Sequence, residues 1–117
     1  MLVDTSVWVD HLRHRNARLA TVLESNPVMT HPFVIGELSC GHLAQHSEVL
    51  GFLNALPTLP LAEHGEVVEF VAAHRLYGRG LGWVDMHLLA AARLAQLPIW
   101  TLDKRLAMVA GEMGLEY

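Results

Sequence analysis

The chain has 117 residues, of which 52% are hydrophobic, and its formal net charge is −4 at pH 7. This length and composition allow one compact domain with a buried core and exclude two separate domains. No segment reaches the ~20 uninterrupted apolar residues of a membrane span, no basic leader is evident, and Cys40 is the single cysteine. We therefore expect a cytoplasmic protein without membrane contact.

Short apolar runs, each bounded by proline, glycine or polar residues, predict strands at 2–5, 27–30, 57–61 and 98–102, with a short edge strand at 115–117. Segments with helical periodicity lie between these runs, at about 7–13, 17–25, 32–44, 47–55, 63–77, 84–96 and 103–113. Alternation of strands and helices predicts an α/β fold with a parallel sheet covered on both faces. In such sheets, ligands bind beyond the carboxyl ends of the strands.

Three aspartates are expected at that edge of the sheet. Asp4 ends the first strand, Asp103 directly follows the strand at 98–102, and Asp85 begins the helix at 84–96. Each aspartate taken alone also fits a helix N-cap, which favours this residue type. Their convergence on one edge predicts a functional site.

Two carboxylates are expected to face the protein interior. Glu37 lies in the middle of a helical segment, where no cap is needed, and helical geometry puts it on the same side as Val34 and Leu38. Asp85 shares its side of the helix with Leu89. Buried carboxylates need a compensating partner.

A divalent cation is the expected partner. The only lysine is Lys104, and the arginines fall mostly in polar loops or on exposed helix faces. Two carboxylates ~4 Å apart repel by ~4 kcal/mol at an effective dielectric near 20. Oxygen ligands suit Mg²⁺ or Mn²⁺. Such ions would also offset the negative charge of the chain, which otherwise argues against a nucleic-acid partner.

Two hydroxyl residues flank the acids. Ser6 stands two residues after Asp4, and Thr101 stands two residues before Asp103. Their hydroxyls could orient a carboxylate or hold a metal-bound water. A helix-start hydroxyl for Ser6 and an ordinary strand residue for Thr101 are equally good explanations.

The motifs together resemble those of PIN-domain ribonucleases, in particular the VapC-type toxins of bacterial toxin–antitoxin modules. They are VDTSVW at the start, the mid-helix Glu37, GWVDMHLLAAARLA, and WTLDKRLAMVAGEMGLEY at the end. The resemblance covers essentially the whole chain, so we expect a single PIN domain over residues 1–117. It implies a three-layer α/β/α fold with a parallel sheet of four or five strands in the order 3-2-1-4-5.

The resemblance also implies an activity and its residues. Asp4, Glu37, Asp85 and Asp103 would be the metal ligands, supported by Ser6 and Thr101. The family hydrolyses RNA phosphodiester bonds with Mg²⁺ or Mn²⁺ and is silenced by a cognate antitoxin. A homodimer is expected on the same ground.

Several basic residues are candidates for contact with the RNA backbone. Arg13, Arg15 and Arg18 lie within six positions shortly after the first strand, and Arg79 lies in a glycine-rich loop just before Asp85. A solvated loop face explains the first three equally well. Arg105 is a further candidate, and it stands where many relatives carry another acid.

Two other classes of function remain open at this point. A phosphoaspartyl-type Mg²⁺ phosphotransfer domain also carries an aspartate after the first strand, although such proteins usually have further acids where Ser6 stands. A catalytically silent PIN-like RNA-binding module is the non-enzymatic alternative. Trapping of an aspartyl phosphate distinguishes the first, and the effect of chelation on activity distinguishes the second.

Overall fold

Two short parallel strands lie at the centre of the protein. In the computed structural model, which describes residues 1–117, β1 (Leu2–Val3) pairs with β2 (Ile99–Trp100). The four side chains of these strands are buried. The first residues of the chain are therefore fixed in the core beside a segment that follows them by almost a hundred positions.

Three isolated parallel bridges lie beside these strands. They join Leu2 to Met29, Thr30 to Thr58, and Ile99 to Glu116. Each bridge falls in a segment predicted as a strand, but each is a single residue pair, and only β1 and β2 form a regular sheet. The α/β class is confirmed, whereas the size of the sheet and the strand order 3-2-1-4-5 stay predictions.

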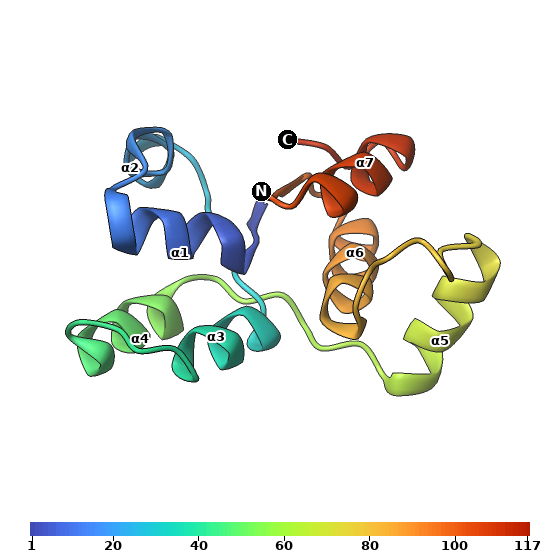
Figure 1. Ribbon diagram of the computed structural model, residues 1–117, viewed down its shortest axis with the longest axis horizontal. Coiled ribbons are helices and arrows are strands. Elements are labelled where there is room, and N and C mark those ends of the chain that lie inside the picture. Colours follow the sequence, from blue (N-terminus) through green and yellow to red (C-terminus); the bar gives the residue numbers. More distant parts are fainter.

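Seven helices surround the strands (Figure 1). They are α1 (Thr5–His14), α2 (Ala17–Ser25), α3 (Pro32–Ser39), α4 (His46–Ala55), α5 (His64–Ala73), α6 (Trp83–Ala95) and α7 (Lys104–Glu112). Helices α1 to α4 lie on one side of the strands in Figure 1, and α5 to α7 lie on the other. α1 packs on α2 and α3, α3 on α4, α5 on α6, and both α6 and α7 pack against β2. None of these helices has the length and apolar content of a membrane span.

Two helices are shorter than predicted. The helix expected at 32–44 ends at Ser39, because the backbone N–H groups of Cys40 and Gly41 each bond three residues back and tighten the last turn. The helix expected at 63–77 ends at Ala73, and Arg75 then adopts a left-handed conformation with φ of 54°. Both endings leave loops at the sides of the molecule.

The helix that carries Asp85 is the most buried of the seven. Every residue of α6 from Met86 to Ala92 is buried, including Leu88 and Leu89, whereas Arg93 is exposed. The predicted burial of Leu88 and Leu89 and the exposure of Arg93 are confirmed, but burial extends to all sides of this part of the helix. A helix enclosed in this way holds the residues of its first turn in a fixed position relative to the strands.

His31 begins the helix that carries Glu37. It is completely buried at the N-cap of α3, where its Nδ1 accepts a hydrogen bond from the backbone N–H of Phe33 at 3.0 Å. Its Nε2 has no hydrogen-bond partner. Burial, assisted by the nearby charge of His87, lowers the pKa of His31 to about 4. The imidazole is therefore neutral in the folded protein near pH 7.

The neutral state of His31 predicts a loss of stability in mild acid. Unfolding returns the pKa of His31 to about 6.5, so between pH 6.5 and 4 the unfolded chain binds more protons than the folded one. The free energy of unfolding should fall as the pH decreases through this window, by up to about 3 kcal/mol from this residue. Urea denaturation at several pH values measures it.

The control is a variant that keeps the N-cap hydrogen bond to Phe33 but has no titratable side chain at position 31. Asn can accept the same bond from Phe33, so His31→Asn should flatten the pH dependence. His14→Asn, at an exposed position in the last turn of α1, should leave it unchanged. Equal slopes for His31→Asn and the original chain would show that another group causes the acid sensitivity.

Candidate active site

Asp4 is a buried carboxylate held by two hydroxyl groups. It is 6% exposed and directly follows β1. Its Oδ2 accepts hydrogen bonds from Ser6 Oγ and Thr101 Oγ1, each at 2.7 Å. Asp4 stands at the N-cap of α1 but makes no side-chain cap hydrogen bond. The helix-cap explanation for Asp4 is therefore wrong, and both predicted hydroxyl residues orient it.

The same hydroxyls tie two distant segments together. Ser6 Oγ accepts a bond from the backbone N–H of Leu102 at 2.9 Å, and Thr101 Oγ1 accepts one from Asp103 at 3.0 Å. The two hydroxyl oxygens are 3.2 Å apart, but both protons are directed to Asp4. Each hydroxyl thus donates a hydrogen bond to Asp4 and accepts one from the backbone of the segment that carries Asp103. The network sets the position of Asp103 relative to Asp4.

Asp85 lies in the electrostatic field of two other acids. It is half-buried in the first turn of α6, and its Oδ2 accepts a hydrogen bond from the backbone N–H of Gly82 at 2.9 Å. Burial raises the pKa of Asp85, and the negative charges of Asp4 and Asp103 raise it further, against the opposing effect of the Gly82 bond. Asp4 and Asp103 therefore lie close enough to Asp85 to act on its charge, which agrees with the predicted convergence of the three aspartates.

Asp103 caps α7 and remains exposed. Its Oδ1 accepts hydrogen bonds from the backbone N–H groups of Arg105 at 2.9 Å and Leu106 at 3.1 Å. The helix-cap explanation is correct for this residue, and it does not exclude a second role, because only one carboxylate oxygen is used.

The hydroxyl that holds Glu37 belongs to a residue that was not predicted as part of the site. Its Oε1 accepts a hydrogen bond from Thr5 Oγ1 at 2.6 Å, which links α3 to the first residue of α1. The expectation that Glu37 faces the interior is wrong, because the side chain is exposed. α3 ends two residues later, at Ser39, so no further turn covers it. The signal for Thr5 was its place between Asp4 and Ser6.

One oxygen of each of the four carboxylates is left without a hydrogen bond. The fold uses Oδ2 of Asp4, Oε1 of Glu37, Oδ2 of Asp85 and Oδ1 of Asp103. No lysine or arginine pairs with any of them, since the one ion pair of the protein joins Arg79 to Glu112. Each acid is thus oriented by the fold and keeps a free oxygen that suits a hard divalent cation.

The acids do not form a closed cage for an ion. No three His, Cys, Asp or Glu side chains stand close enough to hold one metal together. Mg²⁺ does not require such a cage, because it commonly binds through one or two carboxylates, with water and substrate phosphate as the other ligands. The carboxylate oxygens fit a divalent ion whose remaining ligands are water and the phosphate of a substrate.

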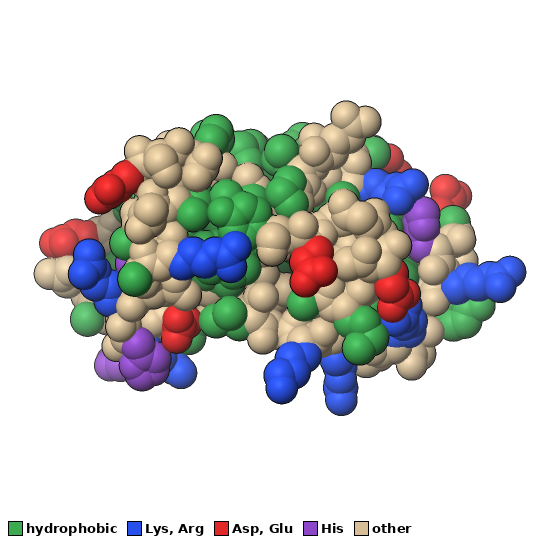
Figure 2. Space-filling model, turned by 90° about the horizontal axis from the view of Figure 1, so that it is seen from above, with side chains coloured by type: hydrophobic (Ala, Val, Ile, Leu, Met, Phe, Trp, Pro, Cys, Tyr) green, Lys and Arg blue, Asp and Glu red, His purple; other side chains and the backbone are tan.

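Several of the candidate basic residues have partners within the protein. Arg79 makes two hydrogen bonds to Glu112, at 2.7 and 2.6 Å, and Arg18 lies over the ring of Trp100 with its guanidinium carbon 4.8 Å from the ring centre. Lys and Arg side chains are scattered among acidic ones on the face in Figure 2. No broad basic surface is visible there, so contact with an anionic polymer depends on individual residues.

Aromatic side chains connect the helices that carry Glu37 and Asp85. The ring centres of Phe33 and His87 are 4.6 Å apart, and those of Trp83 and His87 are 4.7 Å apart. His87 is 3% exposed, so it packs in the interior. The contact packs Phe33 of α3 against His87 of α6.

Comparison with known proteins agrees with this geometry. The PIN domain family matches residues 1–112, a range that includes all four carboxylates and both hydroxyl residues. The chain belongs to the PIN domain family. This PIN domain is 44% identical over 116 residues to Ribonuclease VapC32 of Mycobacterium tuberculosis (strain CDC 1551 / Oshkosh). The matched region covers 98% of this chain and 94% of the relative. The same protein of strain ATCC 25618 / H37Rv matches to the same extent. The resemblance to VapC-type PIN domains is confirmed.

Removal of a hydroxyl that holds Asp4 should destabilise this PIN domain. Ser6→Ala deletes a donor to a buried carboxylate and an acceptor for Leu102, and should cost about 2 kcal/mol in the free energy of unfolding. Ser25→Ala, which deletes a hydroxyl at an exposed helix end, should stay within about 0.5 kcal/mol. Urea denaturation compares them, and equal losses would mean that the Asp4 network adds nothing to stability.

Neutralising Asp85 should have the opposite effect when no divalent ion is present. Asn can keep the bond from Gly82, and Asp85→Asn removes a charge that the fold disfavours, so in EDTA we expect a gain of a few tenths to about 1 kcal/mol. Because the folded pKa is raised, the gain should grow as the pH rises through the range where Asp85 ionises. Glu24→Gln, on the exposed surface, is the matched control. A clear loss of stability in Asp85→Asn would show that the fold already compensates this charge.

Proposed function

We propose that this PIN domain is a divalent-metal-dependent endoribonuclease that acts as the toxin of a toxin–antitoxin pair. The relative that it matches over nearly its whole length is named a ribonuclease. The observation that carries the proposal is the set of four oriented carboxylates, each with one free oxygen and none paired with a basic residue. Asp4, Glu37, Asp85 and Asp103 are the proposed metal ligands, and Mg²⁺ or Mn²⁺ is the proposed cofactor.

The proposed ligands have distinct tasks. Asp4 is the most rigid acid, because burial and two hydroxyl donors hold it in one orientation. Asp85 lies in the first turn of α6, and Asp103 is the N-cap of α7. Glu37 is exposed and held only through Thr5, so it is the acid best able to adjust when RNA arrives. Ser6 and Thr101 are positioning residues.

The reaction would be hydrolysis of a phosphodiester bond. A bound divalent ion supplies Lewis acidity, which lowers the pKa of a coordinated water and offsets charge on the phosphate. The water oxygen bonds to phosphorus, the bond to the 3′ oxygen breaks, and the proton is transferred to that oxygen, which leaves a 5′-phosphate and a 3′-hydroxyl. The role of the chain is to fix carboxylate oxygens where the ion binds, and no protein nucleophile is required.

The two alternative functions are not favoured by any observation. A phosphoaspartyl mechanism would need Asp4 as the nucleophile, and the second acid that such proteins usually carry two residues on is replaced here by Ser6. A silent RNA-binding module would have no reason to keep four hydrogen-bonded acids without basic partners.

The remaining expectations belong to the same proposal. Residues 1–117 would form one cytoplasmic PIN domain, and the single bridges at Met29, Thr58 and Glu116 would mark the outer strands of a five-stranded sheet in the order 3-2-1-4-5. A cognate antitoxin and a second copy of the chain are the proposed protein partners. Apolar surface is available for them around Phe52 on α4 and Leu94 on α6, which are 50% and 73% exposed.

Metal-dependent cleavage tests the function directly. The purified protein with Mg²⁺ or Mn²⁺ should cut RNA, and sequencing of the new ends should find 5′-phosphates. EDTA should abolish cleavage, and Asp4→Asn or Asp85→Asn should reduce it by at least about 100-fold, because each removes a charged ligand. Full activity in Asp4→Asn would contradict the assignment.

A binding measurement separates loss of metal from loss of fold. Mn²⁺ at ten times its dissociation constant should stabilise the protein by about 1.4 kcal/mol, seen as a rise in the melting temperature. Asp85→Asn should lose this rise while it remains folded. NaCl at equal ionic strength is the control, and an equal rise with NaCl would indicate screening of the acids in place of a metal site.

A further inference from the structure

A cavity lies directly beside Glu37, between α1 and α3. It has a volume of about 170 Å³, and its walls include Thr5, Val9, Arg13, Glu37, Leu38 and His42. We refer to it as the α1–α3 cavity. Thr5 and Glu37 are the hydrogen-bonded pair of the acidic site, so the cavity and the proposed metal ligands share a wall.

The size of the cavity limits what it can hold. A buried apolar cavity of about 150 Å³ accepts benzene. The α1–α3 cavity therefore has room for one flat ring system. Val9 on α1 and Leu38 on α3 are apolar residues of the cavity wall, and such a surface suits the face of a planar group.

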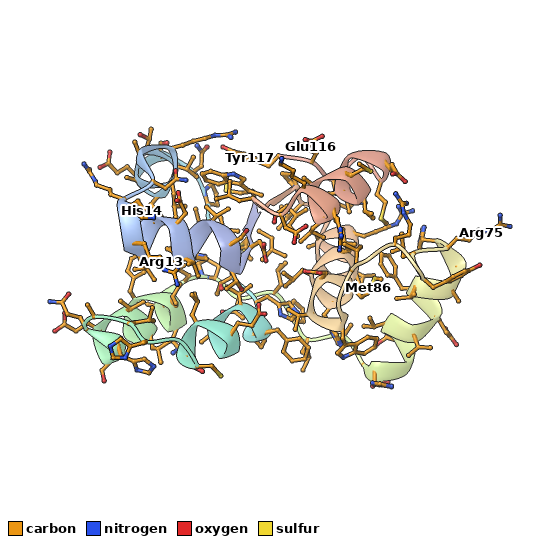
Figure 3. The ribbon with its side chains drawn as sticks, in the orientation of Figure 1. Arg13, His14, Arg75, Met86, Glu116 and Tyr117 are labelled. Carbon is orange, nitrogen blue, oxygen red and sulfur yellow. The ribbon has the colours of Figure 1, made fainter.

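The polar residues of the cavity suit a base. Arg13 and His42 are both exposed and line it with planar groups that donate hydrogen bonds. Figure 3 shows Arg13 on the side of α1 that faces α3 and α4. Single-stranded RNA is recognised through unstacked bases that pack on apolar, aromatic or guanidinium planes and hydrogen-bond at their edges. A positive residue at the cavity also complements the adjoining RNA phosphates.

We propose that the α1–α3 cavity is a nucleobase subsite, in which one unstacked base of the RNA packs against the apolar wall that includes Val9 and is selected by Arg13 and His42. The inference rests on the proposed ribonuclease function, because the phosphate of the same or a neighbouring nucleotide would lie at the acids. Base and phosphate are adjacent within a nucleotide, and the cavity adjoins Glu37. Arg13 and His42 are then specificity-determining residues, separate from the metal ligands.

Cleavage of a random single-stranded RNA pool with Mn²⁺ tests the subsite. Sequencing of the cut ends should show a preference of about tenfold for one base at one position next to the cut. Arg13→Lys keeps the charge but loses the planar group, so it should reduce the preference to below about threefold. His42→Ala should reduce the preference at the same position.

The matched control lies far from the cavity. Arg75→Lys changes an exposed arginine at the opposite end of the molecule in Figure 3, and it should keep the full preference. An unchanged preference in both Arg13→Lys and His42→Ala would overturn the assignment and would leave the cavity to a side chain of a protein partner.

A binding measurement tests, independently of cleavage, whether the cavity binds a base. In EDTA, the ring signals of His42 in NMR spectra should shift when at least one nucleoside 5′-monophosphate is added and should not shift with ribose 5-phosphate. Equal shifts with ribose 5-phosphate would mean a phosphate contact and would overturn the subsite. If no RNA is cut, the proposed function fails, whereas the response of His42 still supports or rejects the subsite.

Discussion

The position of Asp4 depends on two hydroxyl groups from opposite ends of the chain. A carboxylate that is 6% exposed would be costly to bury without hydrogen bonds, and Ser6 and Thr101 supply them. Each hydroxyl also accepts from the backbone of the segment that leads into α7. One network therefore orients the central acid and holds the two strand ends side by side.

The rest of the fold places further acids around this network. α6 is enclosed by other elements, so Asp85 in its first turn has little freedom, and Asp103 is fixed as the cap of α7. The charges of Asp4 and Asp103 raise the pKa of Asp85, which shows that the fold tolerates repulsion at this edge. Such repulsion without an ion pair costs stability, and a cation at the proposed site would relieve it.

Glu37 differs from the three aspartates in its attachment and in the cavity beside it. It is exposed, attached through Thr5 alone, and borders the cavity that contains Arg13 and His42. The aspartates form the rigid part of the site, whereas Glu37 lies where the proposed metal site and the proposed nucleobase subsite meet. A change in the walls of that cavity can thus alter which RNA is preferred without displacing Asp4.

The sequence by itself determined the α/β class, the convergence of Asp4, Asp85 and Asp103 and the apolar side of α6, because strand ends and helical periodicity are local patterns. Only the tertiary structure decided that Thr5 holds Glu37, that Glu37 is exposed, and that α3 ends at Ser39. The same holds for the cavity beside Glu37. These features depend on how α1 packs against α3, and residues 32 positions apart have no spacing that predicts a hydrogen bond between them.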